Sequence, residues 1–240
     1  MIPFSTAPFD FRAGTLLLVN KPKGWTSFDV VNKIRYAIRK QYGQKKFKVG
    51  HAGTLDPMAT GLLVLCTGKW TKRLQELQGL PKTYTGTITF GATTPSYDAE
   101  TEPDEIFPID HITEELLAEA VANQTGDINQ VPPMFSAIKV DGKRLYKLAR
   151  KGEMIEIKPR PVNVARFDLT RIELPEVDFS VDCSKGTYIR SLAYDVGKGV
   201  NSGAHLTALC RTKVGEYSLE DAWDVIELFD YINELERIEG

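Results

Sequence analysis

The stretch KVGHAGTLDPMATGLLVLCTG, residues 48–68, joins a glycine-rich loop to an apolar strand and carries one acidic side chain, that of Asp56. The glycines permit sharp turns and the close approach of another backbone. Pro57 fixes its own φ and pushes Asp56 toward an extended conformation. We therefore expect a loop that holds one carboxylate rigidly at the mouth of a sheet. A turn in which Asp56 only accepts hydrogen bonds from local amides fits the same composition.

The motifs around this segment exclude a phosphate-binding loop and predict no metal site. Gly68-Lys69 resembles the end of a phosphate-binding loop, but Leu63 stands where its first glycine is required and Trp70 where Ser or Thr is required. His51 has no partner at the spacing of a catalytic triad or a metal site. We expect no metal, no other cofactor and no disulfide, because the cysteines are far apart and form no CxxC pair. All three are expected to be buried thiols: Cys66, Cys183 and Cys210.

Apolar patterns along the rest of the chain predict an α+β fold with a largely antiparallel sheet, because strands outnumber helices and come in runs. Buried strands fit residues 14–20 and 62–66. Thr26 or Ser27 can cap a helix that ends near Gly43. The other expected elements are helices at 113–126, 145–150 and 188–196, an exposed acidic loop at 91–112, and strands at 84–90, 135–140, 154–158, 162–174 and 177–183.

The charge of the chain is segregated although its net value is only −2. Residues 1–80 have 13 Lys/Arg against 4 Asp/Glu, and residues 131–160 have 8 against 3. Residues 81–130 have 1 against 10, and residues 161–240 have 8 against 15. The two basic blocks could fold onto one positive face that binds nucleic acid. Charge alone also fits ordinary solvated faces.

The N-terminal residues 1–13 contain two prolines, Asp10 and Arg12, and have neither the cationic start nor the apolar core of a signal peptide. No apolar run approaches the ~20 residues of a membrane span. Together with unpaired cysteines, these features predict a cytoplasmic protein that does not enter a membrane.

The loop GHAGTLDPMATGLL closely resembles the active-site loop of the TruB family, the bacterial synthases that make pseudouridine in the T loop of tRNA. Four further segments resemble the family in the same order: LLLVNKPKGWTSFDVV, the strand start Lys82-Thr83-Tyr84, VPPMFSAIKVDGKRLYKLARKG, and CSKGTYIRSLAYDVG followed by GAHLTALCRTKVG. The resemblance runs from about residue 14 to residue 218. It implies the pseudouridine synthase fold, with a central, largely antiparallel mixed β-sheet, and isomerisation of uridine to pseudouridine at tRNA position 55.

The resemblance also implies roles for individual residues. Asp56 corresponds to the essential catalytic carboxylate, and Arg190 to the arginine that pairs with it. Tyr84 corresponds to the tyrosine that packs on the target base and relays a proton, and His51 to a histidine that contacts the RNA beside the extruded base. The remaining residues expected to line the pocket or bind RNA are Lys21, which supports the pocket tyrosine, and Tyr188, Thr54 and Gly53.

The implied reaction breaks the N1–C1′ bond, rotates the uracil and joins C5 to C1′, so it needs no cofactor. An ionised Asp56 suffices, as a nucleophile at the sugar or the base or as a base that removes a sugar proton, and these alternatives stay open. Arg190 would favour the charged form in a dry pocket. The uridine must flip out at a cost of a few kcal/mol, and stacking on Tyr84 returns about 1–3 kcal/mol. The basic blocks at 33–48 and 139–151 are the expected phosphate contacts.

Family members commonly carry a C-terminal RNA-binding (PUA) domain, whereas an acidic tail at 219–240, too short for that domain, follows the matched region here. We expect an N-terminal extension at 1–13, a catalytic domain at 14–218, and a monomer that contacts the T arm of tRNA without an obligate protein partner. Two other functions stay open: a tRNA-folding chaperone, and a synthase that acts on another RNA.

Overall fold

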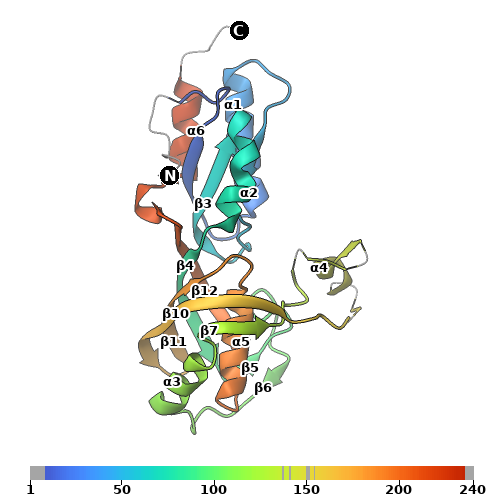
Figure 1. Ribbon diagram of the computed structural model, residues 1–240, viewed down its shortest axis with the longest axis vertical. Helices are drawn as coiled ribbons and strands as arrows, with labels where there is room; N and C mark the ends of the chain where they lie inside the picture. Colours follow the sequence, from blue (N-terminus) through green and yellow to red (C-terminus); the bar gives the residue numbers. More distant parts are fainter. Residues whose placement is uncertain (1–8, 137, 141, 150–151, 154, 236–240) are drawn as a thin grey trace. The chain divides into compact units, whose positions relative to one another are not determined.

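A computed structural model describes residues 9–136, 138–140, 142–149, 152–153 and 155–235. The chain forms two compact units (Figure 1): unit 1 comprises Met1–Thr83 with Cys210–Gly240, and unit 2 comprises Tyr84–Leu209. The chain passes from one unit to the other inside two strands, β4 (Lys82–Phe90) and β12 (Ala204–Val214).

The centre of unit 1 is an antiparallel pair of buried strands, β1 (Leu16–Lys21) and β3 (Thr60–Thr67). Successive side chains point to opposite faces of this pair, and both faces are covered. That double burial explains why the two strands read as unbroken apolar runs in the sequence. β2 (Val49–His51) pairs with β3, and β14 (Trp223–Asp224) pairs with β1. The end of β12 runs parallel to β3, and β13 (Tyr217–Ser218) pairs with β12.

Helices cover the two faces of the β1–β3 pair. α1 (Ser27–Gln41) and α6 (Val225–Glu234) pack on the face that carries Leu17 and Leu65. A short 3₁₀ helix, Gly68–Arg73, leads into α2 (Leu74–Gly79), which packs on the opposite face. The expected start of α1 is confirmed: the Thr26 hydroxyl accepts from the Asp29 amide, and the Asp29 carboxylate accepts from the Thr26 amide in return.

The flanks of the matched region belong to the core of unit 1. Phe9 and Phe11 are buried in the same hydrophobic cluster as α1, and three residues of α6 complete that cluster: Val225, Leu228 and Ile232. The acidic tail therefore contains an amphipathic helix whose apolar side closes the core, and the residues that precede β1 close it from the other end of the chain.

Unit 2 is built around a long antiparallel hairpin, β10 (Arg160–Glu173) and β11 (Glu176–Cys183). β7 (Gly126–Gln130) pairs with the outer side of β10, and β4 lies next to β11. α3 (Glu114–Ala122) and α5 (Ile189–Gly199) pack on each other beside these strands (Figure 1). The mixed, largely antiparallel sheet with flanking helices confirms the predicted α+β class.

The smaller elements of unit 2 are β5 (Ala92–Thr93) paired with β6 (Glu105–Ile106), β8 (Lys139–Val140) paired with β9 (Lys143–Arg144), and α4 (Leu145–Ala149). Three sequence predictions are wrong here. Among the described residues of the strand expected at 135–140, only the two residues of β8 are in a strand, and the described residues 155–158 of the strand expected at 154–158 are not in a strand. The stretch 91–112 is not simply an exposed loop, because it contains β5, β6 and the fully buried Asp98.

Two further sequence expectations concern membranes and cysteines. Among the described helices, none combines the length and the apolar character needed to cross a membrane. None of the three cysteines, which all lie in the described part of the chain, is in a disulfide; Cys66 and Cys183 are buried as predicted, whereas Cys210 is half-buried. Burial raises the pKa of the Cys66 thiol to about 12, so this group stays protonated and unreactive at neutral pH.

Candidate active site

Asp56 lies in the loop that connects β2 to β3 in unit 1. β2 runs antiparallel to β3 as far as His51, and the loop returns to the sheet at Thr60, the first residue of β3. A turn closes the loop through a 3.1 Å hydrogen bond from the Ala59 amide to the Asp56 carbonyl. The Asp56 side chain is half-buried at the start of this turn. The predicted loop between a glycine-rich segment and a buried strand is therefore confirmed.

Arg211, on β12, ties the first half of the loop to the strand that follows it. Its side chain is 1% exposed. Nε donates to the Leu62 carbonyl at 2.8 Å, and Nη2 donates to the Gly53 carbonyl at 3.1 Å. Gly53 has a φ of +105°, a backbone conformation that glycine adopts without strain. Sequence patterns give no reason to single out Arg211, because its partners are backbone groups about 150 residues earlier in the chain.

Ser27 and Lys21 hold the second half of the loop. Ser27 Oγ accepts from the Leu55 amide at 2.8 Å and donates to the Leu55 carbonyl at 3.1 Å. Lys21 Nζ donates to the Pro57 carbonyl at 3.3 Å. Both side chains are buried. Asp56 therefore lies between two residues whose backbone is bound by buried side chains, and we call the three residues Lys21, Ser27 and Arg211 the loop clasp.

Lys21 also donates to the carbonyls of Pro22 at 3.0 Å and Trp25 at 2.6 Å, so its ammonium group closes the turn that precedes α1. These contacts explain why a lysine is fully buried at the end of β1: three carbonyl dipoles solvate its charge. They bind Lys21 to the loop that carries Asp56. The predicted support of the pocket tyrosine by Lys21 stays a prediction.

His51 and Thr54 flank the start of the loop. His51 is half-buried at the end of β2, and Thr54 is exposed. Burial lowers the pKa of the His51 imidazole, and the Arg211 guanidinium lowers that pKa further. The His51 ring is therefore neutral at pH 7, and a neutral ring suits contact with an uncharged base better than contact with a phosphate.

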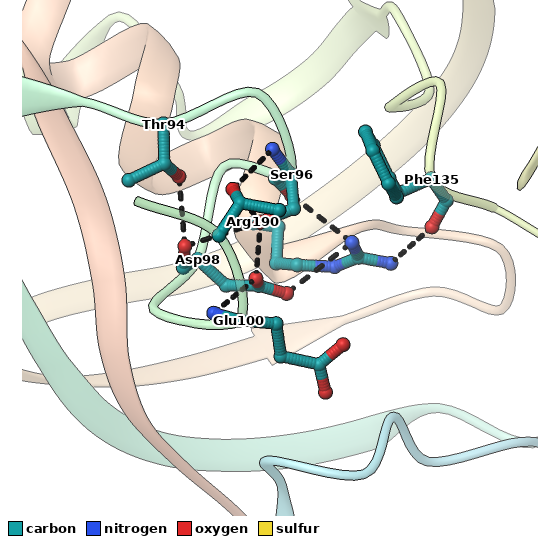
Figure 2. Close-up of polar contacts among 7 residues, drawn as sticks. Thr94, Ser96, Asp98, Glu100, Phe135 and Arg190 are labelled. Atoms are coloured by element: carbon teal, nitrogen blue, oxygen red, sulfur yellow. Dashed lines mark hydrogen bonds and ion pairs between the residues drawn. The ribbon is translucent and has the colours of Figure 1, made fainter. Parts of the chain in front are cut away.

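Arg190 is the second residue of α5 in unit 2, and its guanidinium points into a cluster of acceptors (Figure 2). Nη1 donates to the Ser96 carbonyl at 3.0 Å, and Nη2 donates to the Phe135 carbonyl at 2.9 Å. Nη1 is also 3.3 Å from Oδ2 of Asp98. Arg190 is 4% exposed and Asp98 is 0% exposed, so this is a buried ion pair.

Asp98 is a site residue that the sequence did not indicate. Its Oδ1 accepts from the Ser96 hydroxyl at 2.5 Å and from the Glu100 amide at 3.0 Å (Figure 2). The Thr94 hydroxyl donates to the Asp98 carbonyl at 2.7 Å. Small hydroxyl residues at Thr94 and Ser96 are the available sequence signal, because such side chains bind nearby backbone and carboxylate groups in tight turns.

Tyr188 caps the start of α5. Its amide donates to Oε1 of Gln130 at 2.7 Å, and Nε2 of Gln130 donates to the Tyr188 carbonyl at 3.1 Å. Gln130 is buried at the end of β7, so this pair of bonds ties the helix that carries Arg190 to the sheet. Gln130 is a second residue that sequence patterns did not indicate.

The two units divide the predicted site residues between them. Unit 1 carries Asp56 and four of the predicted binding residues: Lys21, His51, Gly53 and Thr54. Unit 2 carries Tyr84, Tyr188 and Arg190, with Tyr84 buried at the third position of β4. The expected pairing of Arg190 with Asp56 stays a prediction.

The described residues bear on the expectations for metal and RNA binding. The described residues contain no cluster of three or more His, Cys, Asp or Glu side chains that could hold a metal ion. In the basic block 33–48, the side chains of Lys40, Lys45, Lys46 and Lys48 are exposed. Most side chains of the second basic block, 139–151, lie outside the described residues.

Comparison with known proteins places these residues in a family. A family model described as the N-terminal domain of TruB family pseudouridylate synthase matches residues 39–189. A Flavobacterium johnsoniae protein named tRNA pseudouridine synthase B is 58% identical over 91% of this chain and 96% of its own length. A Phocaeicola vulgatus protein of the same name is 53% identical over 95% of this chain and 97% of its own length.

Solved structures agree on the fold. A chain from the crystal structure of a Cbf5-Nop10-Gar1 complex aligns with a TM-score of 0.65 and 28% identity over 90% of this chain. The alignment covers 54% of that chain, so the present protein spans about half its length. The family match, the identity of the relatives over nearly their whole length and the shared fold lead to one conclusion: the chain belongs to the TruB family of pseudouridine synthases.

Proposed function

We propose that this protein isomerises uridine to pseudouridine in the T loop of tRNA, at position 55, with Asp56 as the essential carboxylate. The observation that carries the proposal is the clasped GTLDP loop, which presents a single half-buried carboxylate in a chain of this family. Relatives that share more than half of their residues with it bear the name tRNA pseudouridine synthase B.

The proposed reaction is internal to one nucleotide. The N1–C1′ bond breaks, the uracil rotates, and a C5–C1′ bond forms while the hydrogen at C5 leaves as a proton and N1 gains one. No electrons are gained or lost overall, so one ionised carboxylate, that of Asp56, is chemically sufficient. Arg190 favours the ionised form by its positive charge. Tyr84 offers a ring on which the extruded uracil stacks, and that stacking offsets part of the cost of flipping.

Two finer proposals concern how the protein acts. We infer that one chain acts on tRNA as a monomer, without an obligate protein partner, and that it works in the cytoplasm, where its substrate is. We expect the purified chain to be fully active on its own. Light scattering at the assay concentration should give the mass of a monomer. Activity confined to a dimer or to a complex with a second protein would contradict the first proposal.

The test uses a T-arm stem-loop labelled with tritium at C5 of uridine, because the new C5–C1′ bond displaces that hydrogen. The wild type should release tritium, whereas Asp56→Asn should not, since an amide neither attacks carbon nor accepts a proton. RNA affinity should change little, because phosphates and stacking supply most of it. The matched control is Asp230→Asn, which neutralises an exposed carboxylate on α6 in the same unit. Turnover by Asp56→Asn within about tenfold of the wild type would overturn the assignment.

A further inference from the structure

Tyr97, between Ser96 and Asp98, has a backbone conformation that tyrosine rarely adopts. Its φ is +62°, and Asn201 is the other non-glycine residue with a positive φ in the described part of the chain. Asparagine tolerates this left-handed region through its short polar side chain, whereas a bulky side chain is strained there. Strain of roughly 1–3 kcal/mol persists only where the surrounding structure over-determines the conformation, and it concentrates at functional sites.

Backbone bonds fix the residue from both sides. The Tyr97 amide donates to the Thr94 carbonyl at 3.0 Å, and the Leu206 amide on β12 donates to the Tyr97 carbonyl at 3.0 Å. The Ala99 amide donates back to the Leu206 carbonyl at 3.0 Å. These bonds set the position of the Asp98 backbone between Tyr97 and Ala99.

The side chain of Tyr97 is fixed by a stack on α5. The Tyr97 and Tyr194 ring centroids are 4.0 Å apart with an interplanar angle of 14°. The ammonium group of Lys198 lies 5.6 Å from the Tyr194 ring centroid, on the same helix. Tyr194 follows Arg190 by four residues, so the two side chains leave α5 on one face, one turn apart. The stack therefore joins the neighbour of Asp98 to the helical neighbour of Arg190.

We propose that the Tyr97–Tyr194 stack is a positioning device that holds the Asp98 carboxylate against the Arg190 guanidinium, and this rests on the proposed function, in which Arg190 serves Asp56. Asp98 sits in a short turn whose conformation is strained at the preceding residue, so the turn relaxes when its hold on α5 is lost. A relaxed turn moves Oδ2 away from Nη1, which is only 3.3 Å distant. Arg190 would then lose the carboxylate beside Nη1, while Nη2 kept the Phe135 carbonyl, which lies outside this turn.

The Tyr97 ring acts by packing and not by proton transfer. Burial, with smaller contributions from the neighbouring Tyr194 and Asp195, raises the pKa of the Tyr97 hydroxyl to about 12. The hydroxyl therefore stays protonated at neutral pH. Replacement by phenylalanine should consequently preserve the device, and removal of the ring should destroy it.

Two ring deletions and their phenylalanine counterparts test the proposal. Tyr97→Gly removes the ring and relieves the backbone strain, so it should not lower Tm, whereas kcat should fall about fivefold, the size expected of one aromatic pair. Tyr194→Leu should lower kcat similarly. KM for the stem-loop should stay within about twofold in both, because neither ring is assigned an RNA contact. Tyr97→Phe and Tyr194→Phe should restore kcat, and the double ring deletion should be no worse than either single one.

Hydrogen exchange provides a readout that does not depend on catalysis. The Glu100 amide is protected by its bond to Asp98 Oδ1, so exchange across residues 96–101 should speed up in both ring deletions and stay slow in the phenylalanine variants. Unchanged exchange, or faster exchange with unchanged kcat, overturns the proposal. The proposal is also overturned if the decrease in kcat in the double ring deletion equals the product of the two single decreases. A wild type that forms no pseudouridine would instead refute the proposed function, whatever the exchange data show.

Discussion

Replacing Ser27 by alanine tests whether the loop clasp positions Asp56. Ser27 Oγ makes two hydrogen bonds with Leu55, at 2.8 Å from its amide and 3.1 Å to its carbonyl. Both residues are at most 3% exposed, so water does not replace the lost partner. Each bond contributes about 0.5–1.5 kcal/mol, and a buried amide without a partner costs about 1–3 kcal/mol. We therefore expect Ser27→Ala to destabilise the fold by about 2–3 kcal/mol.

That cost should be visible in both Tm and kcat. For a chain of 240 residues, each kcal/mol moves Tm by about 2–4 °C, which predicts a decrease of about 4–12 °C. A displacement of about 1 Å at a catalytic group can cost on the order of a hundredfold in rate. Release of Leu55, the residue before Asp56, should thus reduce kcat well beyond tenfold. KM should change little because Ser27 is buried.

The control separates loss of stability from loss of position. Ser202→Ala removes another buried serine hydroxyl, which donates to the Pro108 carbonyl at 3.0 Å in unit 2. It should lower Tm by a smaller amount and leave kcat unchanged. Thermal melts and tritium release, measured well below both melting temperatures, make the comparison. Ser27→Ala with wild-type kcat would show that the clasp stabilises the fold without positioning the carboxylate.

Three further outcomes follow from the contacts. Arg190→Lys should reduce kcat about a hundredfold by tritium release, because one ammonium nitrogen cannot occupy the two separate positions from which Nη1 and Nη2 reach the Ser96 and Phe135 carbonyls; near-normal turnover would refute this. Burial raises the pKa of Asp195 from 3.8 to about 6, so the native state binds this proton more tightly than the unfolded state and stability falls as pH rises from about 4 to about 6. Asp195→Asn should therefore raise Tm above pH 6 and lose that advantage near pH 4; an equal effect at both pH values would contradict the assignment. Gly61→Ala should lower Tm by more than Gly24→Ala, since both have positive φ but a Cβ at Gly61 would lie 2.4 Å from a backbone oxygen of β12; equal losses would rule out the steric cause.

The sequence predicts best the elements whose environment is encoded locally. β1 and β3 are buried on both faces, and each reads as a continuous apolar run. The hydroxyl and carboxylate that cap α1 are Thr26 and Asp29, three residues apart. β7 was missed, because its segment GDINQ has an exposed, polar alternation at the edge of the sheet. The segment expected to form a strand at 154–158 has a similar alternation of apolar and polar residues. No strand pairs with its described residues, however.

The sequence predicts poorly the polar groups whose partners are distant. Asp98 lies in an acidic stretch, and its burial depends on Arg190, 92 residues later. Arg211 is buried because carbonyls of Gly53 and Leu62 solvate it, and backbone carbonyls leave no trace in the amino-acid pattern. Asp56 was different because its own segment carries the glycines and the proline that shape the loop. Resemblance supplied Arg190, and the structure added the acceptors that surround it.

The loop clasp follows from a conflict that any such site must resolve. To present Asp56, residues 53–59 must leave the sheet, so their amides and carbonyls lose the partners that a strand would give them. A longer or more exposed loop would satisfy them with water, but it would also let the carboxylate move. Buried side chains from β1, α1 and β12 supply the partners instead, at residues 53, 55 and 57. Two of the three are cations, so the groups that satisfy the backbone also place positive charge behind the loop and favour an ionised carboxylate. With Asp56 as the proposed carboxylate, folding and catalysis are expected to require the same residues, and a clasp of neutral side chains would serve the first without the second.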